Sequence, residues 1–118
     1  MHIESFTEYC LSKKGAEEGF PFDEVTLVLK VMGKIFAITA LDEEVFKVNL
    51  KCDPEKAIEL REEYEEIQPG FHMNKNHWNT VNFEGELRET FLKELIDHSY
   101  AMVVRGMTKK LRDSLNEL

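Results

Sequence analysis

Alternating apolar and polar positions predict three consecutive strands in the first half of the chain. Apolar residues occupy every second position in 25–31 and, most regularly, in 46–51, and the apolar segment 35–41 lies between them. Short turn sequences, Gly33-Lys34 and residues 42–44, separate these segments. Strands joined by such short turns form an antiparallel meander.

Apolar residues at helical spacing predict the remaining elements. A first helix spans about residues 3–14, and a second begins at Asp53-Pro54, an N-cap acid followed by a first-turn proline. An extended segment, 78–83, precedes a long helix over about residues 86–105, and Thr108 can cap a last helix. The apolar stripe expected for the second helix consists of Ala57, Leu60, Tyr64 and Ile67.

This order (helix, three strands, helix, strand, two helices) predicts an α+β fold, an antiparallel sheet with helices packed mainly on one face. Residues 1–118 are expected to form a single domain, since a chain of this length buries a core without staples. The other sheet face is expected to be at least partly exposed to water. The polar side chains that alternation directs to it are Lys47, Asn49, Lys51, Thr80 and Asn82.

The charge is acidic and unevenly distributed. Acids outnumber bases 23 to 15, and the whole excess lies in residues 1–66, which contain 16 acids and 8 bases. Because affinity for nucleic acids depends on neutralising phosphates, DNA could be bound only by the neutral C-terminal part or by a locally basic face.

The lack of a membrane span and of a visible signal peptide bears on the compartment of the protein and on the redox state of its cysteines. No apolar run approaches the roughly 20 residues that span a bilayer, and no signal peptide is visible, so we expect a cytoplasmic protein without a membrane partner. Cys10 and Cys52 are expected to remain reduced thiols there.

The segment 70–79, Gly-Phe-His-Met-Asn-Lys-Asn-His-Trp-Asn, has the composition of a contact surface, since it contains the only tryptophan and no carboxylate. Its asparagines and Trp78 could stack on bases and bond to them, or build a tight turn anchored by the indole. His72 and His77 are five residues apart, which favours bonds to backbone or water over a metal site. The candidate contact residues are His72, Asn74, Lys75, Asn76, His77, Trp78, Lys47, Asn49 and Lys51.

Catalytic signatures are absent: there is no Gly-x-Ser-x-Gly, no glycine-rich phosphate loop and no His-Glu-x-x-His. We therefore expect a binding module without enzymatic activity and without a cofactor, the alternative being an uncharacterised activity around His72 and His77. The acidic second helix is either a solvated face or a site for a hard cation, which prefers oxygen ligands. The ligands of such a site would be Glu55, Glu59, Glu62 and Glu63.

The segment His72 to Val81 resembles the signature of the MmcQ/YjbR family of small bacterial proteins. The resemblance extends to Tyr9-Cys10-Leu11, to Phe46 to Lys51 and to Asp97-His98-Ser99-Tyr100. It implies a frataxin-like α+β fold and a DNA-binding role as a double-wing module.

The sequence therefore indicates two alternative classes of function. In the first, the 72–80 loop and the exposed sheet face bind DNA weakly, and four lysines predict a salt slope of about −3 to −4. In the second, the chain is a module that binds a metal ion, a small ligand or a protein. A monomer or weak dimer is expected in both. The phosphate-neutralising lysines of the first class would be Lys30, Lys47, Lys51 and Lys75.

Overall fold

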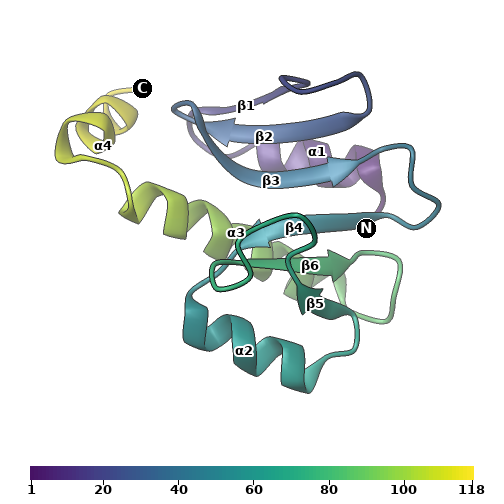
Figure 1. The fold of residues 1–118 in the computed structure, drawn as a ribbon. Coiled ribbons are helices and arrows are strands. Elements are labelled where there is room, and N and C mark those ends of the chain that lie inside the picture. Colours follow the sequence, from purple (N-terminus) through teal and green to yellow (C-terminus); the bar gives the residue numbers. More distant parts are fainter.

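A six-stranded antiparallel sheet forms the centre of the structure, a computed structural model that describes residues 1–118 (Figure 1). Its strands lie in the order β1-β2-β3-β4-β6-β5. The strands are β1 (Ala16–Gly19), β2 (Thr26–Val31), β3 (Lys34–Ala40), β4 (Lys47–Lys51), β5 (Ile67–Pro69) and β6 (Trp78–Asn82). The helices are α1 (Ile3–Leu11), α2 (Pro54–Glu63), α3 (Glu89–Arg105) and α4 (Lys109–Asn116).

The predicted α+β class and order of elements are confirmed, and two short strands are added to them. Strand β1 is Ala-Glu-Glu-Gly and β5 is Ile-Gln-Pro, so neither is long or apolar enough to show an alternating pattern. They pair as the two edges of the sheet, β1 with β2 and β5 with β6. Their conformation is therefore set by the neighbouring strand, which local sequence does not reveal.

The second helix is shorter than its apolar spacing predicts. Its last helical residue is Glu63, and Tyr64 already has an extended backbone. The prediction that Ile67 belongs to the stripe of this helix is wrong, because Ile67 lies in β5 opposite Val81 and is fully buried there. An apolar residue three positions after another fits a helix or a following strand equally well, and pairing with β6 decides between them.

Helices α1 and α3 lie behind the sheet in Figure 1, and they cover one of its faces. The core between these layers includes an aromatic cluster in which Phe6 meets the rings of Phe46 and Phe83 edge to face, with centroids 5.5 Å apart in both pairs. Helix α2 packs beside β5 and β6, at one end of the sheet. No helix is long and apolar enough to cross a bilayer.

Strands β3 and β4 are held together partly by side chains. Their backbone pairing is limited to two residue pairs. Beyond one end of it, Ser99 Oγ from α3 accepts a hydrogen bond from Lys51 N (2.8 Å) and donates one to Phe36 O (2.5 Å). Towards the other end, Thr39 Oγ1 donates to Lys47 O (2.7 Å). The two hydroxyls thus replace bonds that a longer ladder would supply.

Candidate functional site

The sheet face opposite α1 and α3 carries the polar side chains that alternation predicts for it. Apolar residues of β4 and β6, among them Val48 and Val81, point into the core, and the polar residues between them point the other way. Partners directly opposite each other in an antiparallel pair are about 5 Å apart at Cβ. These partners are Lys47 with Asn82, Asn49 with Thr80, and Lys51 with Trp78.

Residues 70–77 form a loop that crosses this face in front of β4 and β6 (Figure 1). Phe71 N donates to Thr80 Oγ1 (2.9 Å), and Asn49 Nδ2 donates to Phe71 O (3.4 Å). Thr80 Oγ1 also donates to Asn49 Oδ1. Asn49, a predicted contact residue, therefore anchors the loop to the sheet.

Most polar groups of the loop are bonded within it or to α2. Asn76 N donates to Asn74 Oδ1 (2.9 Å), the bond of an Asx turn. Lys75 Nζ donates to Gly70 O (2.9 Å), and Arg61 Nη1 donates to Lys75 O (3.0 Å). Two of the predicted contact residues, Asn74 and Lys75, thus shape the loop.

Trp78 acts as the half-buried anchor of this loop. A Cβ added to Gly70 would lie 2.8 Å from both the Cβ and the carbonyl oxygen of Trp78, so only glycine fits there. Lys51 lies opposite Trp78 on β4, and Lys75 is bonded to Gly70. His77 and Asn76 are exposed nearby.

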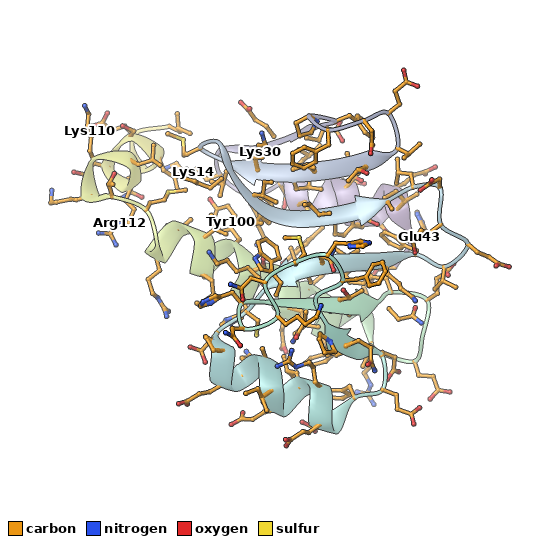
Figure 2. All side chains as sticks on the ribbon, in the orientation of Figure 1. Lys14, Lys30, Glu43, Tyr100, Lys110 and Arg112 are labelled. Atoms are coloured by element: carbon orange, nitrogen blue, oxygen red, sulfur yellow. The ribbon has the colours of Figure 1, made fainter.

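The predicted lysines lie in three separate places. Lys51 and Lys75 gather around Trp78, whereas Lys47 lies four residues from Lys51 along β4, about 13 Å away. Lys30 is further from Trp78 than these lysines. It lies on β2 opposite Glu17, and Figure 2 shows it at β2, away from the 70–77 loop.

A groove of about 840 Å³ opens at the Lys47 end of the exposed face. Its volume is in the range of small-molecule sites. Phe71, His72 and Met73 of the loop line one part of it, while Phe22, from the segment between β1 and β2, and Glu43, labelled at the β3–β4 turn in Figure 2, line others. Strand and junction residues complete the lining: Thr26, Ile38, Thr39, Ala40, Lys47, Asn49, Glu65, Glu66, Gln68, Pro69, Thr80 and Asn82.

Two aromatic side chains at this groove are unusually exposed. Phe22 is 66% exposed and Phe71 is 61% exposed, which leaves most of each ring available for contact. The next residue, His72, has a backbone φ of 61°, a left-handed conformation that residues other than glycine rarely adopt. The centroid of its ring lies 4.1 Å from that of Phe71. Such local strain persists where the surrounding bonds impose it, and it often accompanies a binding site.

The charged groups of the groove take part in no salt bridge within the chain. Both salt bridges of the structure lie elsewhere, between Lys13 and Asp97 and between Lys109 and Asp113. The Lys47 ammonium is thus free to meet a ligand, and the carboxylates at the groove are in no ion pair. These carboxylates belong to Glu43, Glu65 and Glu66.

The four glutamates named as alternative metal ligands lie along the surface of α2. Glu55, Glu59, Glu62 and Glu63 are exposed on α2, and nowhere in the chain do three or more His, Cys, Asp or Glu side chains gather so that they could hold a metal ion.

Tyr9 and Asp97, which belong to the segments that resemble the family, connect α1 to α3 through a hydrogen bond. Asp97 Oδ1 accepts from Tyr9 OH (2.6 Å) and lies 2.5 Å from Lys13 Nζ. The hydrogen bond to this carboxylate raises the pKa of Tyr9 to about 12. These residues stabilise the layer behind the sheet and lie away from the groove.

His98 couples stability to pH. Its Nε2 accepts a bond from Asp53 N (3.1 Å) at the start of α2, and burial, with the nearby Lys56 and Arg105 cations, lowers its pKa in spite of Asp53. A lowered pKa favours the neutral ring in the folded state, so stability is complete above the unfolded pKa of about 6.5 and declines as pH falls below it.

We therefore expect the urea midpoint of the protein to fall between pH 7.5 and pH 5.5. His98→Gln, whose amide oxygen can still accept from Asp53 N, should remove most of this change. Equal pH dependence in the two proteins would contradict the assignment to His98.

Several residues that line the groove were not among the contact residues predicted from the sequence. They are Phe22, Glu43, Glu65, Gln68 and Phe71. Each lies in a loop, a junction or a short edge strand, where no periodicity reports on burial. For Phe22 and Phe71, the presence of an aromatic residue in a turn-like segment was the only signal that the sequence offered.

Comparison with known proteins places the chain among relatives of the same length. The model of a family described as YjbR matches residues 11–102. Uncharacterized protein YjbR of Escherichia coli (strain K12) is 34% identical over 118 residues, all of both chains. Uncharacterized protein YbdF of Escherichia coli O157:H7 is 40% identical over 91 residues, 77% of this chain and 75% of that one.

Solved structures share the fold. The crystal structure of Deinococcus radiodurans protein DR2400, a DUF419 domain, has a TM-score of 0.90 and 36% identity, over 97% of this chain and 87% of that one. A Pseudomonas syringae protein, target PsR293, has a TM-score of 0.76 and 26% identity, over 87% and 99% of the two chains. None of these names states an activity or a ligand.

Proposed function

This chain belongs to the YjbR family, and on that premise we propose that it is a binding module whose exposed-face groove holds a small organic molecule. The observation that supports this proposal is the convergence of unpaired charges and exposed aromatic rings on one groove of about 840 Å³. Small-molecule sites combine such a concave surface with a few polar groups that fix orientation.

A hollow along α1 is a weaker candidate. It has a volume of about 680 Å³, but only α1 and the residue after it line it, between Ile3 and Ser12. A surface on a single helix cannot surround a ligand, whereas residues of β2 to β6 contribute to the groove. The geometry therefore favours the groove over this hollow.

A binding role fits the side chains of the groove better than a catalytic one. No serine or cysteine lines it, and its threonines donate to Asp23, to the backbone of Lys47 and to Asn49 rather than to its one histidine, His72. Covalent catalysis requires a nucleophile within hydrogen-bond reach of a base.

Phe71→Ala is expected to weaken binding of a small ligand about tenfold, because it removes an aromatic wall whose contacts are worth about 1.4 kcal/mol. The measurement is a titration of ¹⁵N-labelled protein with fragment-sized compounds, followed by backbone amide shifts. Binding compounds should shift Asn49, Gln68, Thr80 and Asn82, at the floor of the groove.

The matched control is Phe20→Ala. Phe20 is also exposed, at 46%, but it does not line the groove, so its removal should leave the affinity unchanged. Binding that shifts only amides of α1, or that both variants weaken equally, would contradict the proposal.

A second candidate function is weak contact with DNA around Trp78. The observation that favours it is the position of three cations on the segments around Trp78: Lys51 lies opposite it on β4, Lys75 bonds to Gly70, and Arg61 bonds to the backbone of Lys75. Exposed stacking surfaces flanked by cations are features of single-strand binding sites.

Titration with short DNA tests this candidate separately. Three cations predict a salt slope of about −2 to −3, and the shifts should centre on Trp78 and His77. Lys51→Gln should reduce the slope by about one, whereas Lys93→Gln on α3, behind the sheet, should not. Absence of shifts at low salt would exclude contact with DNA.

A further inference from the structure

We propose that the ligand of the groove is a small organic cation with an apolar or aromatic body. This inference rests on the proposed function of the groove and adds the chemical class of its ligand.

The charges that line the groove favour a cation. Three carboxylates lie there, those of Glu43, Glu65 and Glu66, against the single ammonium of Lys47. Glu43 belongs to the β3–β4 turn, whereas Glu65 and Glu66 belong to the junction between α2 and β5, so the acids come from separate parts of the chain. A ligand in the groove therefore meets negative charge from more than one element.

One of these carboxylates is fixed in place. Glu66 Oε2 accepts a hydrogen bond from Glu86 N (3.1 Å), and the side chain of Glu66 packs against Gly85. No hydrogen bond holds the carboxylate of Glu43 or Glu65, so both can move toward a bound ammonium.

The uncharged part of the lining suits an apolar body. Ile38, Ala40, Pro69 and Met73 contribute aliphatic surface, and the largely exposed rings of Phe22 and Phe71 can receive an aromatic group or the face of a cation.

The net charge of the chain also favours a cationic ligand. A protein of formal charge −8 attracts cations to its clefts and repels anions, and the single Lys47 does not reverse this field. An anionic ligand would gain one ion pair and face three carboxylates.

Three compounds with one body and different charges test the inference: phenylpropylamine, phenylpropanol and phenylpropanoate. Each is titrated into the labelled protein at low salt, and the shifts of the groove amides give the dissociation constant. We expect the amine to bind about threefold more tightly than the alcohol and about tenfold more tightly than the carboxylate, the size of effect that exposed ion pairs produce. Added salt should reduce this preference.

Single substitutions locate the charge that is recognised. Glu65→Gln and Glu43→Gln should each weaken amine binding about twofold to threefold and leave alcohol binding unchanged. Glu59→Gln is the matched control, because Glu59 is exposed on α2 and does not line the groove.

The possible failures are distinguishable. If the carboxylate or the alcohol shifts the groove amides as strongly as the amine, the cation inference is overturned and the proposed function stands. If none of the three compounds shifts these amides at millimolar concentration, both are overturned for this class of molecule.

Discussion

Replacing Ser99 by alanine is expected to lower the free energy of unfolding by about 3 kcal/mol, because it leaves two buried or half-buried backbone groups without partners. Ser99 is fully buried, and its hydroxyl is the hydrogen-bond partner of both Lys51 N and Phe36 O. Alanine keeps the volume nearly unchanged, so the loss measures the two bonds rather than a cavity. Urea denaturation followed by circular dichroism gives the difference.

Ser12→Ala is the matched control for this prediction. The Ser12 hydroxyl donates to Tyr9 O at the exposed end of α1, and its removal should change stability by less than about 0.5 kcal/mol. If Ser99→Ala were no more destabilising than Ser12→Ala, β3 and β4 would not depend on the bridge from α3.

Gly70→Ala is expected to destabilise the protein by about 2 kcal/mol and to displace the loop that forms one wall of the groove. The added Cβ would lie 2.8 Å from the backbone oxygen of Trp78 and 3.1 Å from the Cβ of Met73. Because these neighbours are backbone or close to it, they cannot turn aside as the end of a flexible chain could. Denaturation measures the stability, and amide shifts of Phe71 and Thr80 report the loop.

Gly19→Ala provides the comparison, since nothing lies within 4 Å of a Cβ added there. It should be neutral or slightly stabilising, because alanine reduces the freedom of the unfolded chain. A Gly70→Ala variant as stable as Gly19→Ala, with unchanged loop shifts, would show that the loop can move without cost.

The segment that resembles the family signature illustrates how far the sequence alone could lead. Its composition indicated a contact surface, and the alternation of 78–83 placed Trp78, Thr80 and Asn82 on one side, as the register confirms. The structure assigns part of this segment to building the loop, through the Asx turn of Asn74 and the bond from Lys75 to Gly70. Asn74 and Lys75 of this segment thus shape the loop that forms one wall of the groove.

The sequence by itself determined the class of fold, the order of the main elements and the sides of β4 and β6 that carry polar residues. It could do so because these features depend on local periodicity, which is written in neighbouring residues. The edge strands β1 and β5 and the groove were decided only by the tertiary structure. Phe22, Glu43, Glu65 and Phe71 come together because the sheet brings five separate strands and their loops to one face, and no local pattern records a meeting of distant residues.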